Sequence, residues 1–180
     1  MKSWKVLNTT PVISVEPWFQ ISREEVELPS GRIVSDFYRV VMPEFAMVVP
    51  VTESGDLLMV RGYRHGPRKV CLGVPGGLVE SNETPLEAAR RELLEETGYR
   101  AEDWQSLGAF TVDSNRQGGT AHLFLAKQLM LVERKVDDDA EDLQLEMMKP
   151  DAFLKAVSNQ DVATLATLSA VALALVYGLI

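Results

Sequence analysis

Three glutamates fall within two turns of one predicted helix, and this feature constrains the chain more than any other. The helix is expected over residues 85–97, where it carries Glu92, Glu95 and Glu96. Residues three and four apart share a helix face, so Glu92 and Glu96 project side by side with Glu95 on the flank. Like charges at this spacing destabilise an isolated helix by ~0.2–0.5 kcal/mol per pair. The spacing therefore indicates a site for Mg²⁺, which takes one or two carboxylates together with substrate phosphates.

Capping residues mark both ends of this helix. Thr84 is the expected N-cap, Pro85 suits the first helical position, and Glu87 completes a capping box with Thr84. Gly98 stands where a left-handed C-terminal cap is expected. The buried stripe is predicted at four positions with helical spacing, namely Leu86, Ala89, Leu93 and Thr97. The glutamates then project from the opposite side of the helix.

The segment as a whole resembles the Nudix box, G-x5-E-x7-R-E-U-x-E-E-x-G-U, in which U is a bulky apolar residue. The matching positions are Gly77, Glu83, Arg91, Glu92, Leu93, Glu95, Glu96 and Gly98. Tyr99 is the loosest match, at the last U. Arg91 could reach back to Glu83 or Glu95 and hold those carboxylates in place. The competing interpretation is a solvated acidic helix face, which is the usual role of a charge run.

The resemblance extends over residues 24–130, which look like the ADP-ribose pyrophosphatase branch of the Nudix hydrolases. The segments that carry it are 37–41, 58–66 with its Tyr-Arg-His element, 74–77 before the box, and 122–126. The resemblance implies an α+β fold: an α/β/α sandwich with a mixed sheet between helices and an N-terminal antiparallel sheet region. It also implies a homodimer, because in such enzymes the N-terminal sheet region commonly pairs or swaps with a second subunit.

The chain departs from this branch at three places. Gly73 stands where the branch usually has Glu, two residues before the proline. The loop at residues 112–119 differs from the branch's Pro and Gly pattern, and Gln144 replaces a frequent Glu. These regions help to choose the nucleotide and the group beyond the diphosphate, so the chemistry is better supported than the substrate.

The expected chemistry is metal-assisted hydrolysis of a diphosphate linked to a nucleoside. Mg²⁺ is the expected cofactor, and Mn²⁺ should substitute for it. Glu92 and Glu96 are the expected metal ligands, with Glu95 as a further ligand or supporting group. The resemblance adds the backbone carbonyl oxygen of Gly76 as another ligand. Glu141, in a late acidic loop, is the leading candidate for general base, and simple solvation of that loop is the alternative.

Arginines are the candidates for binding the diphosphate, because a guanidinium fork matches phosphate oxygens. Arg64 is the first candidate, followed by Arg61 and Arg116. The alternative for each of them is an ordinary surface cation. Arg91 and Glu95 complete the catalytic group proposed from the box.

Three functions compete at this stage. The first is hydrolysis of a nucleoside diphosphate sugar, with ADP-ribose as the prime candidate, to a nucleoside monophosphate and a sugar phosphate. The second keeps the box but does other chemistry, such as hydrolysis of dinucleotides or NADH, or isomerisation of a prenyl diphosphate. That isomerisation would need a cysteine in the pocket, and Cys71 is the only one in the chain. The third is a ligand-sensing or protein-binding domain without turnover, although the intact box argues against it.

Composition fits a single globular enzyme. The chain has 180 residues, of which 46% are hydrophobic, enough for one domain with a sizeable core. Its net charge of −8 makes duplex DNA and RNA poor partners. One cysteine and the absence of a signal pattern at the N-terminus favour a cytoplasmic location. We expect residues 1–42 to form dimer-making antiparallel strands and residues 43–180 to form the hydrolase domain.

Apolar runs predict the remaining elements. Strands are expected near 12–28 and 32–42, joined by a turn at 29–31. Further elements are strands near 45–52, 56–63, 69–74, 105–112, 120–129 and 143–148, and a short helix near 151–157.

The last segment, residues 162–180, carries no charge and approaches the length of a membrane span. It is rich in Ala, Thr and Ser and has no basic flank, so we favour a packed terminal helix over a membrane segment. Ser158 or Asp161 is its expected N-cap. Its buried stripe is predicted at Leu165, Leu168, Ala172 and Leu175.

Overall fold

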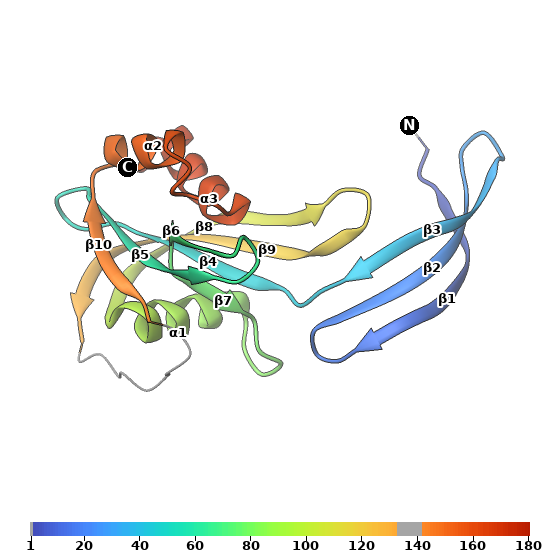
Figure 1. The fold of residues 1–180 in the computed structure, drawn as a ribbon, viewed down its shortest axis with the longest axis horizontal. Coiled ribbons are helices and arrows are strands. Elements are labelled where there is room, and N and C mark those ends of the chain that lie inside the picture. The colour runs from blue at the N-terminus through green and yellow to red at the C-terminus, as the bar shows by residue number, and fades with distance from the viewer. Residues whose placement is uncertain (1, 133–141) are drawn as a thin grey trace. The chain divides into compact units, whose positions relative to one another are not determined.

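The computed structural model describes residues 2–132 and 142–180, and contacts between residues divide the chain into two compact units. The first unit comprises Met1–Glu44 and Phe110–Thr120, and the second comprises Phe45–Ala109 and Ala121–Ile180. Two long strands, β8 (Tyr99–Asp113) and β9 (Gln117–Leu131), form a hairpin whose tip belongs to the first unit (Figure 1). The N-terminal strands and the acidic helix therefore belong to different units.

The first unit contains three antiparallel strands, β1 (Lys5–Val15), β2 (Phe19–Glu27) and β3 (Ile33–Val41). The sequence predicted two strands here, and the first of them, near 12–28, is wrong. A turn at Pro17 divides β1 from β2, and the Trp18 N–H donates to the Val15 carbonyl oxygen at 2.8 Å. Proline alone does not end a strand here, because β1 itself contains Pro11 beside a register shift; the turn at residues 16–18 is what reverses the chain. The predicted turn at 29–31 is present, with Gly31 at a positive φ of 82°.

The second unit contains a mixed sheet and a smaller antiparallel sheet. In the mixed sheet, β4 (Phe45–Pro50) lies between β9, which runs parallel to it, and β7 (Gly76–Leu78), which runs antiparallel. The smaller sheet has the order β10 (Gln144–Met148), β5 (Leu57–Arg64) and β6 (Lys69–Gly73). The sequence did not predict β7, because three residues that include two glycines carry no strand pattern.

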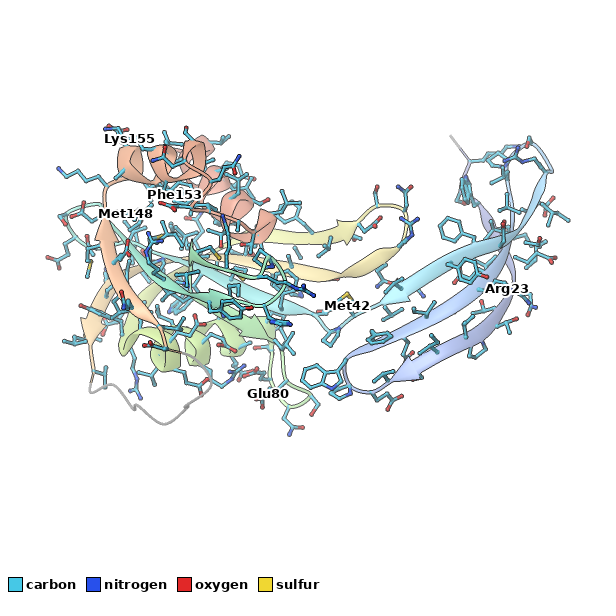
Figure 2. The ribbon with its side chains drawn as sticks, in the orientation of Figure 1. Arg23, Met42, Glu80, Met148, Phe153 and Lys155 are labelled. Atoms are coloured by element: carbon cyan, nitrogen blue, oxygen red, sulfur yellow. The ribbon has the colours of Figure 1, made fainter. Side chains whose placement is uncertain are left out.

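Helices cover the mixed sheet on both faces, with α1 (Pro85–Thr97) on one side and α2 (Pro150–Ser158) and α3 (Leu165–Val176) on the other (Figure 1). Toward α1, Ala46, Val48 and Phe124 pack with Ala89 and Leu93. Toward α2 and α3 lies a larger core, whose members include Val49, Leu57, Met59, Leu72, Leu123, Leu125, Phe153 and Val171. Figure 2 labels Phe153, which is fully buried where α2 meets the sheet. Alternate residues of β4 and β9 thus pack into the cores on opposite faces of the sheet. The predicted α/β/α sandwich is confirmed.

The terminal helix begins later than the sequence predicts. Its N-cap is Thr164, not Ser158 or Asp161. Val162 forms a parallel bridge with Leu72 of β6, and the Leu72 N–H donates to the Asp161 carbonyl oxygen at 2.9 Å. Because Asp161 and Val162 are extended and paired with β6, they cannot belong to the helix.

The buried face of α3 also differs from the predicted one. Leu165 is 78% exposed, and the buried positions are Thr167, Ala170, Val171 and Ala174. Small side chains allow the helix to approach the sheet closely, and three leucines pack only partly against the same core: Leu168, Leu173 and Leu175. Across residues 2–132 and 142–180, no helix is both long enough and apolar enough to cross a membrane.

Candidate active site

The acidic helix begins and ends where the sequence predicts. Thr84 Oγ1 accepts from the Glu87 N–H at 3.3 Å, and Glu87 Oε2 accepts from the Thr84 N–H at 2.7 Å, which completes the capping box. Gly98 adopts the left-handed conformation, with φ at 75°, and its N–H donates to the Leu94 carbonyl oxygen at 2.8 Å. These local interactions set the helix register and hence the direction of each glutamate.

Arg91 holds three of the glutamates. Its guanidinium donates to Glu83 at 2.7 and 3.2 Å, to Glu92 at 2.7 Å and to Glu95 at 3.0 Å. It also donates to the Leu78 carbonyl oxygen at 2.9 Å. These bonds, above all those to Glu83, raise the pKa of Arg91 and keep it a cation. The sequence predicted contacts to Glu83 or Glu95, and the structure contains both and adds Glu92 and Leu78.

Glu96 lies against the loop that precedes the helix. It is 7% exposed, and its Oε2 accepts from the Gly76 N–H at 2.9 Å. Its Oε1 accepts from Arg64 Nη2 at 3.3 Å. A Cβ atom on Gly77 would lie 2.2 Å from Glu92 Oε1, so any larger residue there would displace that carboxylate. The structure therefore brings Gly76 together with Glu96 and Arg64, and brings Glu92 against the same loop.

The donor set suits a hard divalent cation in type and charge. Carboxylate and carbonyl oxygens are the ligands that Mg²⁺ prefers. Four carboxylates face two guanidinium groups, which leaves a net charge of about −2. Among residues 2–132 and 142–180, no three His, Cys, Asp or Glu side chains converge closely enough to hold a metal ion as they stand. The carboxylates of Glu83, Glu92 and Glu95 are bound to Arg91 in this arrangement.

The other predicted arginines have different partners. Arg61 is three residues from Arg64 on β5, so the two side chains leave opposite faces of the strand. Arg61 pairs with both carboxylate oxygens of Glu146 on β10, and this bond raises the pKa of Arg61. Arg116 belongs to the first unit, where its Nη1 lies 3.8 Å from Asp113 Oδ2. Within the second unit, Arg64 is the predicted arginine that contacts the glutamates.

The predicted general base, Glu141, lies outside the described residues. Sequence reasoning missed the Leu78 carbonyl oxygen that receives Arg91, because a backbone acceptor leaves no trace in residue type. The steric role of Gly77 did carry a signal, since Gly77 is the first residue of the box pattern.

Replacing Glu83 by glutamine should remove a pH-dependent contribution to stability. The Arg91 guanidinium, helped by the Glu80 N–H at 2.9 Å, holds the pKa of Glu83 below its usual 4.5. Charged Glu83 therefore stabilises the fold above pH 4.5, and this contribution is lost as the pH falls through the lowered folded-state pKa. We expect Glu83→Gln to lower the free energy of unfolding by roughly 1.5–3 kcal/mol at pH 7 and by much less at about pH 3.

Urea unfolding at the two pH values measures this difference. Glu102→Gln, at an exposed position of β8, is the matched control and should change stability at neither pH. A Glu83→Gln deficit of equal size at both pH values would show that the lost stability does not come from the ionised carboxylate.

Comparison with known proteins decides the family. A sequence model of the NUDIX domain matches residues 42–168. The chain belongs to the Nudix family. The match includes the glycine loop, the acidic helix and Arg64, so the side chains that meet in the structure all lie within the Nudix domain.

Relatives place this Nudix chain more closely, and a solved structure shares its fold. ADP-ribose pyrophosphatase of Bacillus subtilis (strain 168) is 35% identical over 141 residues, which cover 77% of this chain and 75% of that protein. Methanol dehydrogenase activator of Bacillus methanolicus is 33% identical over 66% of this chain and 64% of its own length. A crystal structure of an ADP compounds hydrolase matches with a TM-score of 0.82 at 23% identity, covering 98% of this chain and 95% of that one. The protein is a Nudix pyrophosphohydrolase with ADP-ribose pyrophosphatases among its relatives.

Proposed function

We propose that this Nudix hydrolase cleaves the diphosphate bond of a nucleoside diphosphate derivative, with ADP-ribose or a related nucleotide sugar as substrate. The products are a nucleoside monophosphate and a sugar phosphate. The observation that carries the proposal is the group of four glutamates around Arg91 and Arg64, in a chain 35% identical to an ADP-ribose pyrophosphatase. An acidic cluster at a glycine loop suits a cation with a phosphorylated ligand better than it suits an apolar one.

Mg²⁺ is the cofactor that we propose, with Mn²⁺ as a substitute. Glu92, Glu96 and the Gly76 carbonyl oxygen are the groups that we assign to it, with Glu95 as a further ligand. When bound, the cation would neutralise phosphoryl oxygens and make a water nucleophilic at neutral pH. Arg91 orients Glu92 and Glu95 through its hydrogen bonds, and the Gly76 N–H orients Glu96.

Arg64 is the residue that we assign to the substrate diphosphate. Its side chain is 30% exposed and already contacts the glutamate cluster, so phosphate oxygens could reach it from solvent. Arg61 would have to leave Glu146 to do the same. Arg116, from the first unit, stays a candidate for substrate binding, and Glu141 stays the candidate for general base.

A panel of nucleotide substrates with Mg²⁺, with products identified by mass, tests the proposal. ADP-ribose should yield AMP and ribose 5-phosphate, and isotopically labelled water oxygen should enter only one of the two phosphates. A diphosphate held in one orientation presents one phosphorus to the attacking water, whereas a loosely held one is cleaved from either side. If ADP-ribose is inert and another nucleotide sugar or a dinucleotide is cleaved, the reaction stands and the substrate assignment fails. If no nucleoside-linked diphosphate is cleaved with Mg²⁺ or Mn²⁺, the proposal fails and a sensing role is favoured.

We further propose that two copies of the chain associate through the first unit. Among the residues described in this unit, Val26 is the only hydrophobic side chain that is buried. The large apolar side chains that it exposes include Trp4, Val6, Leu7, Val12, Ile13, Val15, Trp18, Ile33 and Tyr38. A small sheet without a core of its own needs cover, and apolar patches of this size rarely persist on soluble monomers.

The protein should therefore have a dimeric mass in light scattering at micromolar concentration. Ile13→Glu, at a position 47% exposed on β1, should convert it to a monomer because a charge cannot be buried in the interface unpaired. Leu165→Glu makes the same change at a position 78% exposed on α3 and should leave the dimer intact. A monomeric wild-type protein would reject the proposal, and dissociation by Leu165→Glu alone would move the interface to the terminal helix.

A further inference from the structure

The turn at residues 74–76 joins β6 to β7. Its three residues each form a hydrogen bond with a different element of the fold. The Pro75 carbonyl oxygen accepts from the Val48 N–H of β4 at 2.9 Å. The Gly76 N–H donates to Glu96 Oε2 of α1 at 2.9 Å. In the third hydrogen bond, the Val74 N–H donates to a side chain of the terminal helix α3. The backbone that carries Gly76 is thus anchored to the sheet and to helices from both faces of the sheet.

The acceptor of this third bond is Thr167, a polar residue on the buried face of α3. Thr167 is 1% exposed, and its Oγ1 accepts from the Val74 N–H at 3.4 Å and from the Thr164 hydroxyl at 3.0 Å. Val74 is itself 1% exposed, so water cannot replace the hydroxyl as a partner for its N–H. An alanine, as at position 170 on the same face, would fill the site but leave that N–H unpaired.

Thr167 also lies close to the residue before the turn. A Cβ atom on Gly73 would lie 3.5 Å from Thr167 Oγ1, an ordinary van der Waals contact. The hydroxyl of the terminal helix therefore packs against the end of β6 as well as accepting from the Val74 N–H.

We propose that Thr167 is a positioning residue for the hydrolase reaction. It acts through the turn, since Val74 lies two residues before Gly76, which binds Glu96 and is assigned to the cation. This inference rests on the proposed function. With its third anchor removed, the turn gains freedom where the Gly76 carbonyl oxygen and the Glu96 carboxylate must keep a fixed separation.

Thr167→Val tests this, because it keeps the shape of the side chain and removes the acceptor. We expect kcat to fall about 10-fold with KM changed less than about twofold, as is typical when a group behind a metal ligand is lost. The dissociation constant of Mn²⁺, titrated without substrate, should rise by about the same factor. Amide hydrogen exchange should become faster at Val74 and Gly76. Thr167→Ser keeps the oxygen and should restore kcat and the Mn²⁺ affinity to within about twofold of the wild-type values.

Thr164→Val is the matched control. It removes the N-cap hydroxyl that donates to Thr167 and leaves the acceptor of the Val74 N–H in place, so kcat and Mn²⁺ affinity should stay at their wild-type values. An equal loss in Thr164→Val would show a general effect of α3 and overturn the proposal. Wild-type Mn²⁺ affinity and wild-type Gly76 exchange in Thr167→Val would also overturn it. If Thr167→Val does not fold, Thr167→Ala removes the same hydroxyl and provides the same comparison.

The same measurements separate this inference from the proposed function. If the wild-type protein binds Mn²⁺ but cleaves no diphosphate, the proposed function fails, and the Mn²⁺ titrations and amide exchange still decide the role of Thr167. If the wild-type protein binds no Mn²⁺, the inference fails, because there is then no cation site for the turn to shape.

Discussion

Hydrolysis should fall by at least about 10³-fold when excess chelator removes divalent cations, and it should return when Mg²⁺ is restored. The physical reason is charge. Arg91 is the single cation among the eight residues that match the box, and it is already bound to three glutamates. The cluster is therefore anionic where a diphosphate has to bind, and transfer of a phosphoryl group needs its oxygens neutralised. Initial rates with and without chelator, on the best substrate of the panel, measure the effect.

Thermal unfolding provides a control that does not depend on turnover. A cation that binds the folded state raises the midpoint of unfolding, and the stabilisation grows with the logarithm of its concentration relative to its dissociation constant. We expect Mg²⁺ to stabilise the wild-type protein in this way and chelator to leave it folded. Full turnover in excess chelator, with metal removal verified by elemental analysis, would contradict the metal-assisted mechanism.

Glu96→Gln should lower kcat by at least about 10²-fold while the fold survives. Glu96 is the least exposed of the four glutamates, and its two oxygens contact Gly76 and Arg64, so it joins the glycine loop to the arginine assigned to the diphosphate. Glutamine keeps the size of the side chain and one acceptor oxygen but loses the negative charge. The loss of repulsion from Glu92, four residues away, should stabilise the helix by ~0.2–0.5 kcal/mol.

Glu87→Gln is the matched control for this substitution. Glu87 belongs to the same helix but serves the capping box, where its carboxylate accepts from Thr84. Its replacement should leave kcat within about twofold of the wild-type value and lower the melting temperature slightly, because only the cap is weakened. A near-normal kcat in Glu96→Gln would show that Glu96 is not a metal ligand, and an equal loss in Glu87→Gln would show that any change in this helix lowers kcat.

The acidic helix was the most predictable part of the chain, because its determinants are local. Thr84, Glu87 and Gly98 act within one or two turns, so their roles follow from spacing alone. The approach of Glu92 and Glu96 to one side follows from the helical repeat in the same way. Most strands were also predicted within a few residues, since alternating apolar side chains are a local signal.

Two errors arose where a distant contact decided the structure. The face that α3 buries depends on how the helix packs against β4, and small residues rather than leucines are the buried ones there. The divergent roles of Arg61 and Arg64 depend on which strand and which helix lie on each side of β5. Arg61 and Arg64 are the same residue type on the same strand, and only their partners differ.

The sequence by itself determined the family, the α+β class, the register of the acidic helix and the identity of its carboxylates. These properties depend on residue type and on spacing within a few turns, which sequence contains directly. The tertiary structure decided how Arg91 divides its hydrogen bonds, which arginine meets Glu96, and that Thr167 reaches the turn from 93 residues away. Such contacts depend on the three-dimensional packing of the sheet and its helices, and a pattern read along the chain does not record that packing.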